Sequence, residues 1–212
     1  MLSSYFTVKG YGEHEISIQR SRFITFVNRV TSEEEAQQFI EKIKKEHWNA
    51  NHNCSAYMIG ENDQIQKAND DGEPSGTAGV PMLEVLKQRK LKDTVVVVTR
   101  YFGGIKLGAG GLIRAYSTAT SEGLAHTGIV ERCLTQHYKT TIDYHFLGKV
   151  ENELHSSPYE IKDIHYLETV QIETYVLVGQ EDAFEEWITN LTSGQAKIEK
   201  VKLHYLEKST SY

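Results

Sequence analysis

The chain has 212 residues, of which 39% are hydrophobic and 25% are charged, as in an ordinary soluble globular protein. It contains no run of about 18 apolar residues and does not begin with the basic and apolar regions of a secretory signal, so neither a membrane-spanning nor an exported protein is expected. Its two cysteines follow no disulfide or metal-binding spacing, which favours a reducing, cytoplasmic setting.

The formal net charge of −6 is unevenly distributed along the chain. Residues 1–133 carry 16 Lys+Arg and 16 Asp+Glu, whereas residues 134–212 carry 7 and 13. This asymmetry predicts two domains, at residues 1–134 and 135–212. The acidic domain lacks the clustered cations that grip a nucleic-acid backbone, so it is a candidate surface for a protein partner instead.

The N-terminal residues alternate between strand-like and helix-like patterns. Residues 13–30 mix β-branched and aromatic residues and predict two strands that turn near Arg20. Residues 31–48 predict a helix, because Ser32 and Glu35 stand at capping-box spacing. Its expected buried stripe comprises Ala36, Phe39, Ile40 and Ile43.

A second strand-and-helix segment follows. Residues 53–60 predict a strand, and residues 61–68 predict a turn and a second short strand. The loop at 69–81 is rich in turn-forming residues. A helix should begin close to Pro81, because proline is tolerated only in the first helical turn.

The apolar run at 93–100 predicts a strand that is buried on both faces. A glycine-rich loop then leads into a helix that ends near residue 126. The expected buried stripe of this helix comprises Leu112, Ile113, Tyr116, Ala119 and Leu124.

The pattern of residue types changes after about residue 133. The pattern predicts a β-α-β-β-α-β order, which is the ferredoxin-like split unit. The expected elements are a strand at 137–144, a helix at 146–157, two strands within 159–178, a helix at 181–194 and a strand at 196–208.

The stretch RYFGGIKLGAGGLIRAYS, residues 100–117, is the first candidate for function. A strand that ends in a glycine loop and opens a helix is a common phosphate-binding geometry, because the first amides of a helix are unpaired and its dipole favours an anion. A tight glycine hinge between strand and helix is the structural alternative. The candidate anion-binding residues are Arg100, Gly103, Gly104, Lys106, Gly108, Gly110, Gly111 and Arg114.

Known nucleotide-binding fingerprints do not fit this loop. Ala109 and Gly110 follow Gly108 where a P-loop has lysine and then serine or threonine, and the G-x-G-x-x-G spacing of dinucleotide-binding proteins is also missing. The sequence therefore identifies neither a P-loop nor a Rossmann site.

The loop NDDGEPSGTAG, residues 69–79, is the second candidate. Its hydroxyls and amides are suited to face the glycine loop, and its carboxylates are suited to hold a cation or to act as a general base. The same residue types also form Asx turns and helix caps, so both interpretations stay open. The residues concerned are Asp70, Asp71, Glu73, Ser75 and Thr77.

Three further residues, His52, Tyr101 and Tyr116, are auxiliary candidates. His52 and Cys54 lie two apart on a predicted strand and hence on one face. They are too few to complete a zinc site, so no metal is expected, and such a cysteine is most often a buried apolar residue. Tyr101 and Tyr116 flank the glycine loop and are suited either to stack on bases or to pack in the core.

Three separated blocks resemble the signatures of the Impact family, in its bacterial YigZ/YvyE-type branch. They are NHNCSAY, NDDGEPSGTAGVPML and VVVVTRYFGGIKLGAGGLIRAYS. The resemblance implies an α+β protein whose first domain is similar to domain 2 of ribosomal protein S5. It also implies a ferredoxin-like second domain similar to the C-terminal domain of elongation factor G.

The resemblance further implies a link to translation. Eukaryotic members regulate translation under amino-acid stress, and ribosome or nucleic-acid binding has been proposed for bacterial members. We therefore expect a non-enzymatic protein without a cofactor that binds RNA or the ribosome through the glycine loop. The alternatives are an enzyme acting on a nucleotide or another small phosphorylated ligand, with Asp70, Asp71 or His52 as base, and a protein-interaction module.

Overall fold

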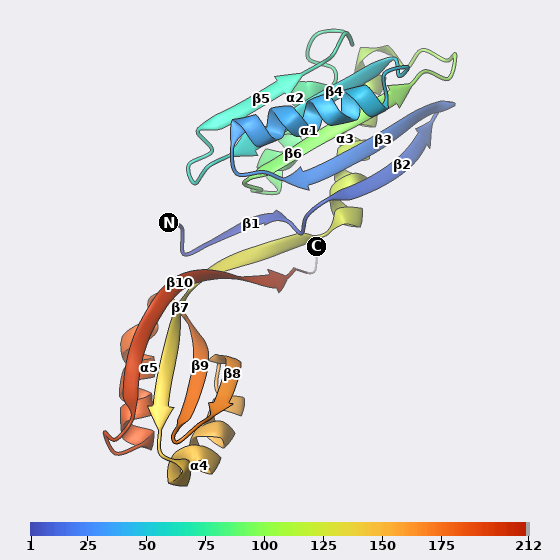
Figure 1. Cartoon of the computed structure of the whole chain (residues 1–212). Coiled ribbons are helices and arrows are strands. Elements are labelled where there is room, and N and C mark those ends of the chain that lie inside the picture. Colours follow the sequence, from blue (N-terminus) through green and yellow to red (C-terminus); the bar gives the residue numbers. More distant parts are fainter. Residues whose placement is uncertain (211–212) are drawn as a thin grey trace. The chain divides into compact units, whose positions relative to one another are not determined.

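The computed structural model describes residues 1–210 as an α+β fold with two five-stranded sheets and five helices (Figure 1). The chain divides into two compact units. The first unit comprises residues 5–132 and 208–210, and the second comprises Met1–Ser4 and Cys133–Glu207. Within the described residues, no helix is long and apolar enough to cross a membrane.

Strands and helices follow one another along the whole chain. The elements before residue 128 are β1 (Ser4–Val8), β2 (Gly12–Ile18), β3 (Ser21–Arg29), α1 (Glu33–Glu46), β4 (His52–Ile59), β5 (Ile65–Asn69), α2 (Gly79–Gln88), β6 (Thr94–Tyr101) and α3 (Gly108–Thr127). The later elements are β7 (Ile129–Ile142), α4 (Tyr144–His155), β8 (Glu160–Tyr166), β9 (Val170–Leu177), α5 (Glu181–Leu191) and β10 (Lys197–Ser209).

The first unit is built on an antiparallel sheet of order β2-β3-β6-β4-β5. Its central strand β6 carries the valine run, and both faces of that strand are buried, as predicted. Val95 and Val97 pack on one side of the sheet, and Val96 and Val98 pack on the other. The apolar run therefore forms the middle of two cores.

Helix α1 covers one face of this sheet. Ser32 is its N-cap and accepts a hydrogen bond from the amide of Glu35 at 3.2 Å, while the Glu35 carboxylate accepts from the amide of Thr31 at 2.6 Å. The predicted buried stripe is confirmed at all four positions, which are Ala36, Phe39, Ile40 and Ile43.

Helices α2 and α3 share the core on the opposite face of the sheet. Helix α3 packs closely on β3, because a Cβ on Gly123 would lie 2.4 Å from Cγ2 of Thr25. Ile113 is a correction to the predicted stripe, since its side chain is 42% exposed. Leu112 and Tyr116 do face the core, and Ile113 is rotated about 100° from Leu112 around the helix axis.

The second unit has the predicted β-α-β-β-α-β element order. Its strands lie in the order β10-β7-β9-β8, with antiparallel pairing of β7 with β9 and of β9 with β8. Helices α4 and α5 bury Val150 and Phe184 against the sheet residues Tyr138 and Ile172. Strand β1, which pairs with β7, and the start of β7 at Ile129 were not among the predicted elements.

Candidate functional site

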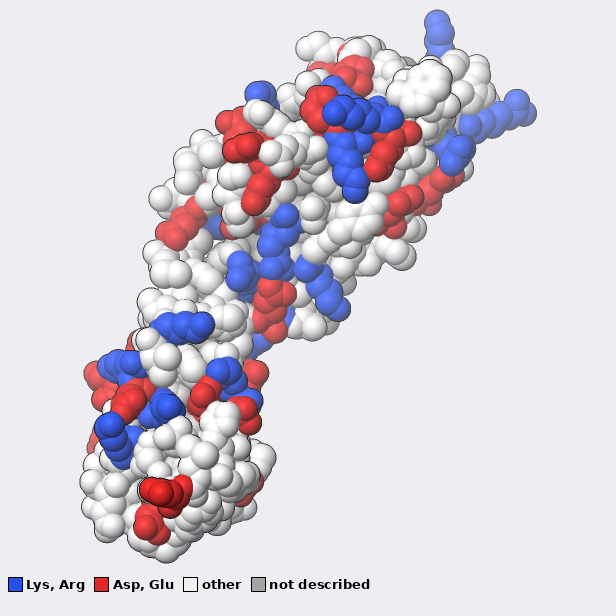
Figure 2. Space-filling view, viewed as in Figure 1, with Lys and Arg blue, Asp and Glu red and all other residues white. Residues whose placement is uncertain are grey.

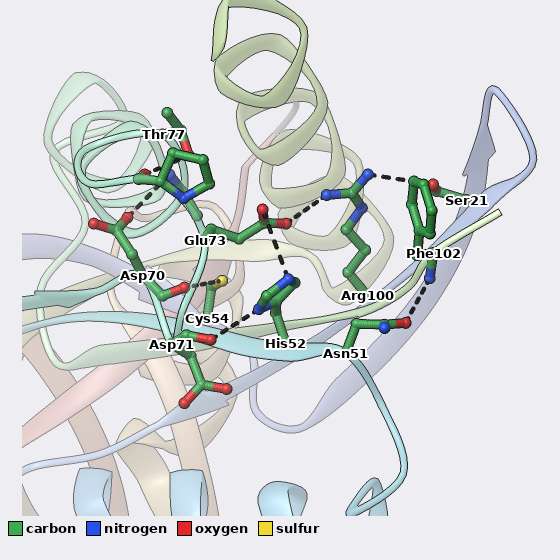
Figure 3. Close-up of polar contacts among 12 residues, drawn as sticks. Ser21, Asn51, His52, Cys54, Asp70, Asp71, Glu73, Thr77, Arg100 and Phe102 are labelled. Atoms are coloured by element: carbon green, nitrogen blue, oxygen red, sulfur yellow. Dashed lines mark hydrogen bonds and ion pairs between the residues drawn. The ribbon is translucent and has the colours of Figure 1, made fainter. Parts of the chain in front are cut away.

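Glu73 lies at the centre of a buried polar cluster that joins the two candidate loops (Figure 3). Its Oε1 accepts hydrogen bonds from Nη1 of Arg100 at 2.6 Å and from the hydroxyl of Tyr116 at 2.8 Å. Its Oε2 lies 3.8 Å from Nε2 of His52. Strand β6, helix α3 and strand β4 therefore converge on one carboxylate from the loop before α2.

Arg100 is held in the interior by two aromatic rings and by Glu73 and Ser21, while its Nε has no hydrogen-bond partner among the described residues. Its guanidinium carbon lies 5.4 Å from the ring centroid of Phe23 and 5.5 Å from that of Phe102, and Nη2 donates to Oγ of Ser21 at 3.4 Å. Arg100 is only 5% exposed. This corrects its expected role at the loop surface, because its charge is balanced internally by Glu73.

Asp70 caps helix α2 from outside that helix. Its carboxylate accepts hydrogen bonds from the amides of Gly76 at 2.8 Å, Ala78 at 3.1 Å and Gly79 at 2.8 Å. Burial acts to raise the pKa of Asp70, but the three backbone donors outweigh it and hold that pKa below its usual value. The capping interpretation therefore applies to this residue.

Asp71 and His52 are also engaged in bonds that shape the loop. The Asp71 carboxylate accepts from Nζ of Lys44 at 2.9 Å and from the amide of Asn53 at 2.7 Å. Nδ1 of His52 donates to the Asp71 carbonyl oxygen at 2.9 Å, which leaves Nε2 facing Glu73. Neither side chain is presented to the glycine loop as an unpaired base.

Cys54 and Tyr116 belong to the core. Tyr116 is completely buried, so of the two roles expected for it the structure supports packing in the core. The single S–H of Cys54 has two acceptors within reach, the carbonyl oxygen of Asp70 at 3.0 Å and the Tyr116 hydroxyl at 3.4 Å. Burial raises the pKa of Cys54 to about 12, so it is a protonated thiol at neutral pH rather than a nucleophile.

Of the remaining predicted residues of the second loop, Thr77 bonds within its own turn and not to the glycine loop. Thr77 is buried, and its hydroxyl donates to the carbonyl oxygen of Pro74 at 2.6 Å within the same turn. Ser75 is exposed. Across the described residues, no group of three His, Cys, Asp or Glu side chains is arranged to hold a metal ion.

The start of the glycine loop is pinned to the β2–β3 turn. The amide of Gly103 donates to Oγ of Ser21 at 3.2 Å, and a Cβ on Gly103 would lie 2.0 Å from the carbonyl oxygen of Arg20. Gly103 is therefore required for packing. The register of β3 with β6, which pairs Arg22 with Tyr101, brings the exposed Arg20 to this loop, and local sequence patterns do not reveal that neighbour.

The first turn of α3 is open. Its N-cap residue Leu107 provides no side-chain hydrogen bond, and the turn contains no acidic residue. A Cβ on Gly110 would meet only Nη1 of Arg114, at 3.7 Å, so this guanidinium reaches back towards the loop as helix geometry predicts. Gly104 and Gly108 have φ values of +86° and +69°, which give the loop its turns.

Lys106 and Arg114 are exposed, unlike Arg100. Neither forms an ion pair or hydrogen bond with another residue in the range 1–210. Tyr101 is partly buried and its hydroxyl contacts Nδ1 of His47 at 2.9 Å, so its ring belongs to the α1 side of the sheet. Of the three predicted cations, Arg100 is therefore buried, whereas Lys106 and Arg114 are exposed.

The substitution Asp70→Asn should lower the free energy of unfolding by about 1–2 kcal/mol at neutral pH, because an amide nitrogen would face an amide donor. The lowered pKa of Asp70 means that its contribution is full above about pH 4 and is lost as the pH falls through the folded-state value. Urea unfolding across this pH range should show the wild-type advantage shrinking in acid. A constant difference, or an equal loss in the exposed control Asp182→Asn, would contradict the cap.

The substitution Glu73→Gln should cost about 3–5 kcal/mol, because it leaves the buried Arg100 charge without its partner. Arg100→Met removes that charge, so the double variant should lose clearly less than the sum of the single losses. A double-mutant cycle by urea unfolding measures this coupling. Additive losses would show that the pair does not interact in the folded state.

The chain matches two protein-family models. Residues 19–124 match the Impact N-terminal domain. Residues 140–195 match a domain of unknown function (DUF1949). A solved structure described as "Crystal structure of an hypothetical protein" is similar with a TM-score of 0.60 and 28% identity, covering 95% of this chain and 99% of that one.

Individual relatives extend the likeness to full length. The "IMPACT family member YvyE" of Bacillus subtilis is 65% identical over 212 residues, which span 100% of this chain and 98% of the relative. An "IMPACT family member" of Haemophilus influenzae is 35% identical, over 95% of this chain and 99% of the relative. The "Protein IMPACT homolog" of Saccharomyces cerevisiae is 35% identical over 49% of this chain and 42% of its own length. The chain belongs to the Impact family.

Proposed function

We propose that this protein binds RNA, free or in the ribosome, without catalysing a reaction on it, and that it acts in the regulation of translation. The first turn of α3 is the observation that carries the proposal. It presents exposed residues Gly108, Ala109 and Gly110 without a capping side chain or an acidic neighbour. Unpaired amides and the helix dipole attract phosphate at such a terminus.

Cations surround this helix terminus and support the proposal. Arg114 reaches back over Gly110, Lys106 lies in the loop itself, and Arg20 lies in the turn against Gly103. Figure 2 shows Lys and Arg side chains projecting from the end of the first unit where the glycine loop and the β2–β3 turn lie. These groups can form charge-assisted hydrogen bonds to phosphate oxygens.

The proposal requires a local contact rather than a broadly basic domain, because residues 1–133 are electrically neutral overall. Three cations would release few counterions. For single-stranded RNA, these three cations alone should therefore contribute about −2 to the slope of the logarithm of the affinity against the logarithm of salt concentration.

The alternative of an enzyme acting on a small phosphorylated ligand has less support. It requires a base within hydrogen-bond reach of the phosphate site. Asp70 and Asp71 are engaged by backbone amides and Lys44, and Nε2 of His52, the nitrogen not used in its bond to a backbone carbonyl, faces the buried Glu73 carboxylate at 3.8 Å. These bonds favour a binding function over a catalytic one.

We also infer the finer fold assignments. The element order of the second unit and its strand order β10-β7-β9-β8 are typical of a ferredoxin-like domain. The first unit, with three helices on a five-stranded antiparallel sheet, is compatible with the S5 domain 2-like fold that the family resemblance implies. Kinship of fold alone does not establish mechanism, so the functional proposal depends on α3.

Gly110→Ala separates binding from stability. No packing neighbour forbids the methyl group, so the variant should be as stable as the wild type or up to about 1 kcal/mol more stable. The methyl group would, however, obstruct a phosphate approaching the amides, and affinity for RNA should fall about tenfold. Fluorescence anisotropy with a labelled oligouridylate of about twelve nucleotides measures this loss.

The matched control is Gly148→Ala in α4, where a Cβ meets nothing within 4 Å and therefore also fits without a clash. It should change stability in the same direction and leave RNA affinity unaltered. Equal affinities for Gly110→Ala, Gly148→Ala and the wild type would overturn the assignment of α3 as the RNA site.

A further inference from the structure

Helices α4 and α5 cover one face of the sheet of the second unit and leave the other face open. Alternate residues of β7 and β9, such as Tyr138 and Ile172, point towards α4 and α5 and form the core. The residues between them lie on the opposite face. There the register pairs His137 with Tyr175 and Lys139 with Glu173.

Aromatic rings from three strands meet on this open face. The rings of Tyr175 and His204 stack with their centroids 5.4 Å apart and an interplanar angle of 24°. Tyr175 also lies against the His137 ring at 5.3 Å. His137 is buried, Tyr175 is partly exposed and His204 is exposed, so the stack begins inside the sheet and ends at the surface.

The charge of the open face differs from the charge of the unit as a whole. On this face, the carboxylate of Glu173 contacts Nε2 of His137 at 3.0 Å, Nε2 of His165 at 3.4 Å and the ammonium group of Lys162. Lys139 stands opposite Glu173 in the register and makes no ion pair with any described residue, but together with the ion pair from Lys197 its charge helps to hold the pKa of Glu199 on β10 below its usual value. The helices carry much of the negative charge, at Glu151, Glu153, Glu181, Asp182, Glu185 and Glu186.

We propose that the open face of this sheet binds unpaired nucleotides of RNA, with a base stacking on the Tyr175–His204 pair and the backbone passing Lys139 and Lys162. The RNA as ligand rests on the proposed function, but the surface is separate from the first turn of α3. It adds a preference for single strands that α3 alone does not provide.

The preference follows from the rings. A base in a duplex is already stacked on both faces, whereas an unpaired base has a face to offer to an aromatic side chain. A four-stranded sheet that carries aromatic residues on its central strands is a known arrangement for this purpose. The expectation that the acidic half does not contact nucleic acid came from its total charge. That total does not apply to the open face, because much of the acid lies on the opposite side.

The test uses the full chain, the labelled oligouridylate and three tyrosine variants. Tyr175→Ser removes the ring, and Tyr175→Phe retains it. Tyr166→Ser removes a ring that is 58% exposed at the end of β8, outside the stack. Tyr175→Ser should weaken binding about tenfold, whereas the other two should change it by less than about twofold. A duplex of the same length should compete poorly.

Photo-crosslinking gives a second readout that loss of folding cannot imitate. An oligonucleotide containing 4-thiouridine should cross-link to the wild-type peptide that carries Tyr175 or His204. If Tyr175→Ser fails to fold, His204→Ala can be tested in its place, because His204 is exposed. The same loss of RNA affinity is expected.

The outcomes separate this inference from the proposed function. If Gly110→Ala weakens binding and Tyr175→Ser matches Tyr166→Ser, the sheet inference is overturned and the α3 proposal stands. If Tyr175→Ser weakens binding and Gly110→Ala does not, the α3 proposal is overturned and the sheet inference stands. Failure of the wild-type chain to bind the oligonucleotide overturns both.

Discussion

The ion pair between Glu73 and Arg100, at 2.6 Å in the interior, is the contact on which the arrangement of the first unit depends. It joins the loop before α2 to the end of the central strand β6, and Tyr116 connects the same carboxylate to α3. A buried pair of this kind adds little net stability compared with apolar packing, but loss of one partner is severe. Here the ion pair holds the loop before α2 and the glycine loop after β6 in a fixed position relative to each other.

The charged groups that pair inside the molecule determine which groups remain available to a ligand at its surface. Arg100, Asp70 and Asp71 shape the two loops, and they are unavailable to a ligand. The open groups are the first amides of α3 with Lys106 and Arg114. On the proposed function, binding of an anion from outside would need no rearrangement of the buried cluster.

Local patterns in the sequence predicted most of the helices and strands. They could not predict contacts between segments that are distant in the sequence. The capping position Ser32 and the valines of β6 follow from short-range periodicity and were confirmed. The pairing of Glu73 with Arg100 depends on the sheet register, and the cap that Asp70 forms on Gly79 depends on the path of a loop. Strand β1 lacks a distinctive alternation of its own. The stack of Tyr175 on His204 likewise needs three strands to be placed.

Backbone amide chemical shifts report directly on whether the first turn of α3 contacts RNA phosphate. In a titration of the ¹⁵N-labelled chain with short oligouridylate, we expect the amides of Ala109, Gly110 and Gly111 to shift early and raised salt to reverse these shifts. If these amides stay unmoved while other residues saturate with RNA, the helix terminus is not the binding site. In that case the glycines serve only to turn the chain from β6 into α3.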